Sequence, residues 1–225
     1  MHLKILTPAA RKVLKVIAPI AAAKGFVLAG GTAVALHLGH RLSQDFDFFT
    51  MRSFRPGKLH RAINGLDLET MVLQEEPGTL TLSAEGVKVS FFHYPYAFLE
   101  TTSTLHGIQI AGLIDVASMK LMAMMQRGAK RDYVDLYWIL QDIPFSKIAA
   151  NMINRYGANR VNPLVIGKAL VYYQDADADP DPAYLGKRMP WVKIKRYFID
   201  HVQQFVLDIH QVLKNNSKPG AGLIV

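Results

Sequence analysis

The sequence predicts an α+β fold, in which a mixed sheet with flanking helices is followed by a C-terminal helical region. Two observations indicate this class. Short apolar runs bounded by glycines and turn residues alternate with helical patterns up to about residue 112. After that residue the strand-like runs stop and only helical periods remain. We therefore expect an α/β domain over residues 1–112 and a helical domain over residues 113–225 that packs on it.

Local signals predict the elements of the first half. Thr7 is a typical N-cap residue, and Pro8 is tolerated in the first turn of a helix. We therefore expect a helix that begins there and ends at Gly25. Residues 26–29 form a short apolar run that suits a buried strand, and Gly30-Gly31 ends it. The other expected elements are helices over 32–38 and 56–66, and strands over 46–49, 68–73, 79–84, 87–93 and 108–111.

Five helices are expected in the second half, over residues 113–127, 130–141, 145–156, 163–173 and 191–214. A polar break over residues 174–182 separates the last two. Its aspartates alternate with alanine and proline, and it lacks the central glycine and terminal glutamate of a calcium-binding EF-hand loop. We expect a mobile loop there.

Composition restricts the classes of protein. The chain has 225 residues, of which 50% are hydrophobic and 20% charged, so a wholly disordered chain is excluded. It has no cysteine, which excludes disulfide scaffolds, thiolate zinc fingers and thiol nucleophiles. The net charge of +8 suits an anionic partner such as nucleic acid or a nucleotide, although a basic solvated surface would give the same number. No apolar run is long enough to span a membrane, and we expect a cytoplasmic protein.

Two aspartates on the expected strand over residues 46–49 are candidate metal ligands. Side chains alternate along a strand, so Asp45 and Asp47 face one way while Phe46 and Phe48 face the other. The two acidic residues then stand about 6–7 Å apart at their backbones. Two neighbouring carboxylates disfavour each other's ionised form, and Mg²⁺, which prefers oxygen ligands, would compensate. The alternative is a pair of solvent-facing acids on an edge strand.

The Gly30-Gly31-Thr32 turn is a candidate phosphate site. It lies between an expected strand and an expected helix, where backbone N–H groups and the positive end of the helix dipole meet. Glycine lets a phosphate approach the backbone closely. The turn matches neither the P-loop spacing nor the dinucleotide-binding fingerprint, and a Gly-Gly pair alone is often only a turn.

Together, the glycine turn and the Asp-x-Asp strand resemble the nucleotidyltransferase (DNA polymerase β-like) superfamily. Residues 30–36 and 39–49 look more closely like the AbiEii/AbiGii-type nucleotidyltransferase toxins, which include abortive-infection and type IV toxin–antitoxin toxins. A second match lies in residues 115–121 and 127–137, so the resemblance covers roughly residues 25–140. It implies a nucleotidyltransferase fold, in which the helical domain completes the active-site cleft.

The resemblance also assigns residues in the second match. Lys120 is implied as a phosphate or transition-state contact, and Asp132 as a base or a support for the metal site. From the pattern alone, Lys120 lies on or beside an apolar stripe and either snorkels to solvent or points at an anion. Asp132 and Asp135 share a helical face, where they form a surface cluster with Lys130 and Arg131 or orient other cations.

One departure from the superfamily pattern is visible. Many nucleotidyltransferases carry a third carboxylate on a later strand, but residues 87–92 contain no acid, and Ser90 is expected at the equivalent position. Without this acid, we expect a site with one metal ion or a different catalytic base, such as Asp132. The alternative is a catalytically silent member of the superfamily.

Two further residues precede the aspartates. Arg41 is expected either to hold a triphosphate with its guanidinium fork or to pair with Asp45. Ser43 is expected either to form a hydrogen bond with the backbone of the site or to be an ordinary turn residue.

The sequence therefore predicts a Mg²⁺-dependent enzyme that moves a nucleoside monophosphate from an NTP to an RNA, such as a tRNA, or to a protein. A toxin with a cognate antitoxin is implied by the resemblance. The alternative is an inactive member of the same fold that binds nucleotide or RNA.

Overall fold

A computed structural model describes residues 1–100 and 102–216 of the chain. The residues cluster into two compact units. One contains Met1–Val116 together with Ala183–Lys187, and the other contains Ala117–Pro182 and the chain from Arg188 onward. The predicted division after residue 112 and the packing of a helical domain on the first one stay predictions.

A mixed seven-stranded sheet forms the centre of the first unit, in the order β3-β4-β5-β2-β1-β7-β6. β1 runs antiparallel to β2, whereas β2 and β5 are parallel, as are β1 and β7. This confirms the predicted mixed sheet. The strands are β1 (Val27–Ala29), β2 (Phe46–Thr50), β3 (Thr70–Glu76), β4 (Thr79–Ala84), β5 (Val87–His93), β6 (Ser103–Leu105) and β7 (Ile108–Ile110).

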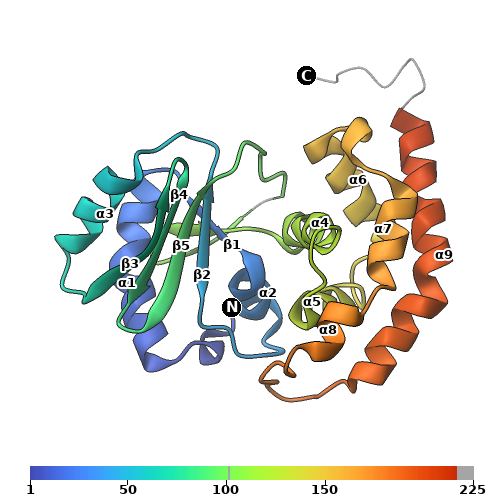
Figure 1. Ribbon diagram of the computed structural model, residues 1–225, viewed down its shortest axis with the longest axis horizontal. Helices are drawn as coiled ribbons and strands as arrows, with labels where there is room; N and C mark the ends of the chain where they lie inside the picture. The colour runs from blue at the N-terminus through green and yellow to red at the C-terminus, as the bar shows by residue number, and fades with distance from the viewer. Residues whose placement is uncertain (101, 217–225) are drawn as a thin grey trace. The chain divides into compact units, whose positions relative to one another are not determined.

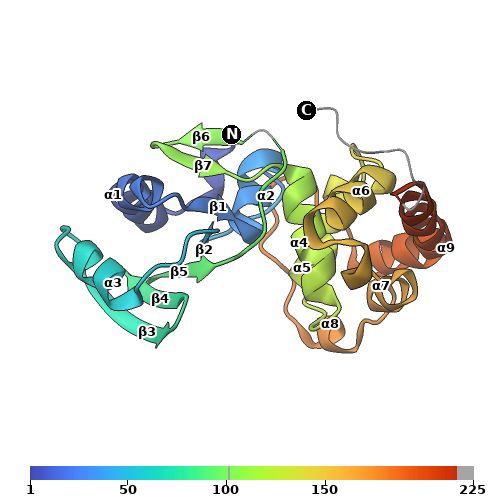
Figure 2. The same ribbon diagram turned by 90° about the horizontal axis from the view of Figure 1, so that it is seen from above.

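Helices flank both faces of this sheet (Figures 1 and 2). A 3₁₀ turn (Leu3–Ile5) precedes α1 (Pro8–Ala23), which lies with α3 (Pro56–Asn64) on one face, while α2 (Gly30–Leu38) lies on the other. The N–H of Ala10 donates to the Thr7 hydroxyl at 3.2 Å, which confirms the predicted N-cap of α1. The face toward α1 and α3 is apolar, and Phe46, Phe48 and Phe91 on it are fully buried.

Two details of the sheet differ from the prediction. β3 extends to Glu76, beyond the strand expected over residues 68–73, so that only Pro77 and Gly78 separate it from β4. β6 was not expected, because this short edge strand has no apolar run and takes its conformation from pairing with β7.

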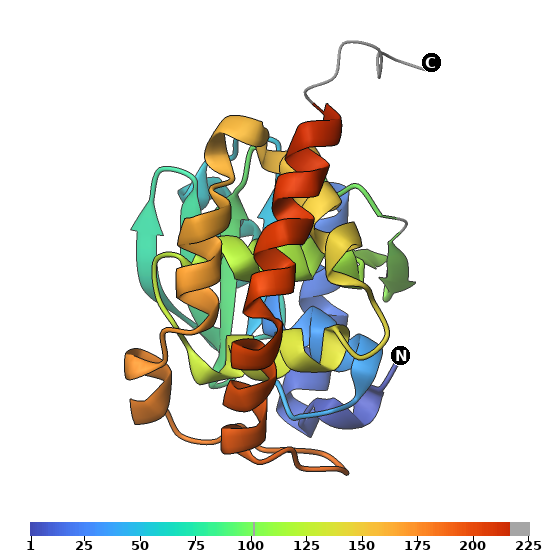
Figure 3. The same cartoon turned by 90° about the vertical axis from the view of Figure 1, so that its right-hand side faces the viewer.

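The second unit is helical. It contains most of α4 (Leu113–Met124), α5 (Lys130–Ile139), α6 (Phe145–Tyr156), a 3₁₀ turn (Ala158–Arg160), α7 (Pro163–Leu170), α8 (Gln174–Ala178) and α9 (Trp191–Asn216). α9 packs along α6 and α7, as Figure 3 shows. The rings of Phe145 and Phe205 stack at 4.2 Å between α6 and α9. In the described part of the chain, no helix is both long and apolar enough to cross a membrane.

The expectation of a loop over residues 174–182 is wrong at residues 174–178, which form a short helix, and the mobility of the segment stays a prediction. The segment begins with α8, and its aspartates hold it to neighbouring helices. Asp177 accepts from Trp191 Nε1 at 2.6 Å and from Lys195 Nζ at 2.9 Å, while Asp179 accepts from the Lys130 N–H at 2.9 Å. These hydrogen bonds lower the pKa of the Asp177 carboxyl. The cations that bind the aspartates lie far from them in sequence, so the local pattern gave no sign of this anchoring.

Reciprocal hydrogen bonds fix the start of α4 to the chain before it. Glu100 Oε2 accepts from the N–H groups of Ile114 (2.6 Å) and Asp115 (3.1 Å). In return, Asp115 Oδ2 accepts from the N–H groups of Leu99 (2.8 Å) and Glu100 (2.9 Å). Asp115 is fully buried, and its loss would leave two backbone donors without their charged acceptor.

We expect Asp115→Ala to lower the free energy of unfolding by about 1–3 kcal/mol, because two backbone N–H groups lose a charged acceptor. Urea denaturation measures this. Asp67→Ala, at an exposed position of the same unit, should change stability by no more than about 0.5 kcal/mol. Equal effects of the two substitutions would contradict the role given to Asp115.

Candidate functional site

Asp47 lies on the less buried side of β2, and Asp45 immediately precedes this strand. Phe46 and Phe48 are fully buried, whereas Asp45, Asp47 and Phe49 are all partly exposed. The burial pattern alternates as predicted, because successive side chains of a strand point to opposite faces. Asp47 therefore lies on the face opposite to the phenylalanine core. That Asp45, one residue before β2, faces the same way stays a prediction.

Asp47 lies directly against the start of α2. In the register of the sheet it pairs with Ala29, the last residue of β1, and α2 begins at the next residue. Gly30 has φ of 66°, and a Cβ added there would lie 2.7 Å from Asp47 Oδ2. The sheet thus brings together a carboxylate and the glycine turn that the sequence singled out.

Thr32 and Ser43 fix the segment that carries Asp45. The Thr32 hydroxyl donates to the Asp45 carbonyl, and since it has a single hydrogen it accepts from the Ser43 hydroxyl, 2.7 Å away. Thr32 is 2% exposed and its hydroxyl holds the loop, so only its backbone N–H is left as a candidate donor to an anion. No side chain of the described residues caps α2.

Arg41 is buried, at 4% exposure, and its Nη1 donates to the Leu42 carbonyl at 3.0 Å. Its backbone forms a bridge with Tyr184. On either side of this bridge, Leu42 N donates to Ala183 O (2.8 Å) and Leu185 N donates to His40 O (2.9 Å). Residues 183–187 thus form a strap across the loop that precedes the aspartates, a feature with no sequence signal. The predicted triphosphate contact of Arg41 stays a prediction.

The donor set suits a hard cation that also binds its substrate. Asp47 on β2 and Asp45 just before it offer up to two carboxylates, and Mg²⁺ typically takes one or two carboxylates and completes its shell with water and phosphate. Residues 1–100 and 102–216 contain no group of three or more histidine, aspartate or glutamate residues placed to hold a metal. The register pairs Asp47 with Ser90. That this position corresponds to the third acid of other superfamily members stays a prediction. Ser90 is 1% exposed and accepts a long hydrogen bond from Thr81 (3.4 Å).

A second cluster of predicted residues lies in the helical unit. Lys120 Nζ of α4 lies 2.7 Å from Asp132 Oδ1 and 2.8 Å from Asp135 Oδ2, both on α5. All three side chains are at most 8% exposed. Lys120 therefore points at anions and does not snorkel, and Asp135 orients it, which was one of the predicted alternatives. The other predicted alternative, a surface cluster of Asp132 and Asp135 with Lys130 and Arg131, is wrong. Lys130 Nζ instead donates to the Asp179 carbonyl and forms an ion pair with Asp181.

The second oxygen of Asp132 stands out in this cluster. Oδ2 is buried and accepts no hydrogen bond within the described part of the chain. A buried acceptor without a partner is costly, so this atom is suited to receive a hydrogen bond or a proton from a bound molecule. Its neighbour Tyr133 stays neutral, since burial, followed by the charges of Tyr173 and Asp132, raises the pKa of its hydroxyl well above the usual range.

Comparison with known proteins identifies the family of the chain. The family model of the nucleotidyl transferase AbiEii toxin, type IV toxin–antitoxin system, matches residues 12–201. The chain belongs to this family. It is also 32% identical over 200 residues to an uncharacterized protein of Aquifex aeolicus, covering 87% of this chain and 95% of that protein. The membership confirms the predicted enzyme class, nucleotidyltransferase.

Solved structures agree on the fold of this AbiEii-family chain. JHP933 from Helicobacter pylori superposes with a TM-score of 0.54 at 18% identity, over 94% of this chain and 97% of that one. A solved structure described as a putative nucleotidyltransferase from H. pylori gives a TM-score of 0.57 at 16% identity, over 90% of this chain and 96% of that one. At these identities the likeness concerns the fold alone.

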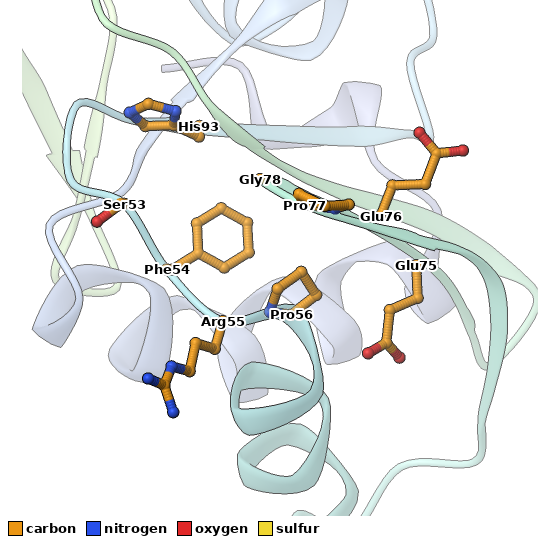
Figure 4. Close-up of a pocket in the computed structure, with 9 residues that line it drawn as sticks. All are labelled: Ser53, Phe54, Arg55, Pro56, Glu75, Glu76, Pro77, Gly78 and His93. Carbon is orange, nitrogen blue, oxygen red and sulfur yellow. The ribbon is translucent and has the colours of Figure 1, made fainter.

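A hollow of about 590 Å³ lies elsewhere in the first unit. It is lined by residues 53–56 before and within α3, by the β3–β4 turn and by His93, and Figure 4 shows the ring of Phe54 among them. None of the predicted site residues lines it. It lies beyond the C-terminal end of β2, whereas the glycine turn lies beside Asp47, near the N-terminal end of that strand.

Replacing Gly30 tests the close approach of Asp47. Gly86 has a similar φ of 77°, and no described heavy atom lies within 4 Å of a Cβ added there. Gly86→Ala should cost about 1–2 kcal/mol, the strain of the left-handed conformation alone. Gly30→Ala should cost about 1–3 kcal/mol more, because the new methyl group collides with the carboxylate.

Urea denaturation of both variants measures the difference. Adding Asp47→Ala to Gly30→Ala should recover much of the extra loss, since it removes the atom in collision. Equal losses for the two glycines, with no recovery, would show that Asp47 does not lie against Gly30.

Removal of the Lys120 charge should destabilise the protein strongly. Lys120→Met leaves two buried carboxylates without their cation, and we expect a loss of about 3–5 kcal/mol in the free energy of unfolding. Lys147→Met, at an exposed position of α6, should stay within about 0.5 kcal/mol. A loss below 1 kcal/mol for Lys120→Met would mean that the buried ion cluster does not form.

Proposed function

We propose that this chain transfers a nucleoside monophosphate from an NTP to a hydroxyl group of an RNA or a protein, and that Mg²⁺ supports the reaction. A tRNA end is the first RNA acceptor to test. The observation that carries the proposal is the Asp47 carboxylate lying against Gly30, at an α2 N-terminus that no described side chain caps. Anionic phosphates bind well at such helix ends, and enzymes of this family generally use a divalent metal.

The residues of the first unit would bind the triphosphate. The N–H groups of Gly30, Gly31 and Thr32 face the phosphates, and Arg41 is the candidate for a further contact. Asp45 and Asp47 would hold Mg²⁺, which when bound neutralises phosphate charge and favours attack at phosphorus. Ser43 supports the site indirectly, through the Thr32 hydroxyl that positions Asp45.

In the transfer step, the acceptor oxygen bonds to the α-phosphorus while the bond from that phosphorus to the β-bridging oxygen breaks. Pyrophosphate leaves, and the acceptor proton moves to a carboxylate. Asp132 is the candidate base because its Oδ2 is buried without a hydrogen bond from the described residues; support of the metal site is its other proposed role. Lys120, held by Asp132 and Asp135, would offset negative charge in the transition state.

The family implies a biological context for this activity. Its model describes the toxin of a type IV toxin–antitoxin system, so we propose that the chain acts as a toxin and is opposed by a cognate antitoxin. NTP and RNA are both plentiful in the cytoplasm, where we expect the protein to act.

A second candidate is an inactive member of the family that binds nucleotide or RNA without turnover. The pairing of Asp47 with Ser90 favours it, because a site with fewer carboxylates holds metal less firmly. The two candidates share the phosphate site and differ only in turnover.

Incubation with labelled NTPs, Mg²⁺ and total RNA or protein tests the proposal. The wild-type protein should label an acceptor, and Asp45→Asn or Asp47→Asn should lower the rate by at least about 100-fold, because the isosteric amide cannot supply the negative charge. Asp67→Asn, an exposed change in the same unit, should leave the rate unchanged.

The outcomes separate the candidates. Binding of NTP by the wild type without labelling would favour the inactive member. Full labelling by both aspartate variants would show that the site has been assigned to the wrong residues. A rate lost in Asp132→Asn but kept in Asp135→Asn would support Asp132 as the base.

A further inference from the structure

We propose that Phe49 and Phe92 form a stacking surface for a nucleobase, next to the phosphate site on the same face of the sheet. This inference rests on the proposed function and adds a binding site to it. The ligand chemistry is a planar, aromatic base joined through a sugar to a phosphate.

The two rings are neighbours across β2 and β5. The register pairs Phe49 with Phe92, two residues further along both strands than the Asp47–Ser90 pair. The two ring centroids lie 5.2 Å apart with an interplanar angle of 31°. Since side chains repeat every second residue, Phe49 shares the face of Asp47. Both rings are partly exposed, whereas the paired rings of Phe48 and Phe91 on the opposite face are fully buried. The sheet thus has an aromatic core on one face and a partly open aromatic pair on the other.

Neighbouring rings hold Phe49 in place. Tyr94, just after β5, meets it edge-on at 5.4 Å and 70°, and Tyr96 meets Tyr94 at 5.1 Å and 66°. Edge-to-face contacts of this kind fix ring orientation. A ring fixed in this way loses little conformational freedom when a base stacks on it, which favours binding.

The order of groups along β2 matches the order of groups in a nucleotide. The Asp47 row is polar, with Ser90 and Thr81 beside it, and the next row on the same face is aromatic. Two residues of a strand span about 7 Å, a distance that a ribose bridges between its 5′-phosphate and its base. A nucleotide with its phosphate at Asp47 and Gly30 can therefore place its base over Phe49. Stacking on aromatic side chains tolerates any base and is worth roughly tenfold or more in affinity.

The stacked base comes either from the NTP or from the acceptor RNA, and binding measurements distinguish the two. The probes are the four MgNTPs and ribose 5′-triphosphate, which has the phosphates and sugar without a base. Phe49→Leu and Phe92→Leu should weaken MgNTP binding about tenfold and leave ribose 5′-triphosphate binding unchanged. Phe49→Trp, which keeps an aromatic face, should restore it. Phe54→Leu is the matched control, since Phe54 is partly buried in the same unit but lies at the separate hollow.

Unchanged MgNTP binding with about a tenfold higher KM for acceptor RNA would assign the surface to the acceptor base and also support the proposal. Unchanged NTP and RNA parameters would overturn it, as would an equal loss for ribose 5′-triphosphate, which indicates general damage. If Asp47→Asn abolishes binding while Phe49→Leu does not, only the stacking surface fails. A wild-type protein that binds no NTP would overturn the proposed function as well.

Discussion

The close approach of the Asp47 carboxylate to Gly30 is the constraint on which the candidate site depends. The antiparallel pairing of β1 with β2 places Asp47 opposite the last residue of β1, so the carboxylate meets the first turn of α2. A Cβ at that position would collide with it, and the left-handed backbone disfavours other residues as well. A cation that holds the carboxylate and a phosphate that binds the helix end can then share one small volume.

The helical unit buries a cluster of three charged side chains. Lys120 is buried with two carboxylates, a group with one positive and two negative formal charges. Burying such a group costs free energy, so its presence is weak evidence that it serves stability. The buried Asp132 oxygen that accepts no hydrogen bond from the described residues suggests that the arrangement serves chemistry, in keeping with the family's activity.

Local sequence signals predicted most of the fold, and contacts between distant residues account for what they missed. The period-two alternation around Phe46 and Phe48 and the cap at Thr7 act within a few residues, so they could be read directly. The anchoring of residues 174–182 and the strap over residues 183–187 depend on partners far along the chain. Phe49 is an instructive omission, because the same alternation that placed Asp47 also placed this ring on the aspartate face.

The most direct test replaces Mg²⁺ by Mn²⁺ and follows the backbone amide NMR signals of the protein with NTP present. The paramagnetic ion broadens signals of nearby nuclei, so the account predicts selective broadening at Gly30, Gly31 and residues 45–47, and its loss in Asp47→Asn. Broadening that spares these residues and gathers at the hollow around Phe54, or at the aspartates of residues 175–181, would contradict the assignment of the metal and phosphate site.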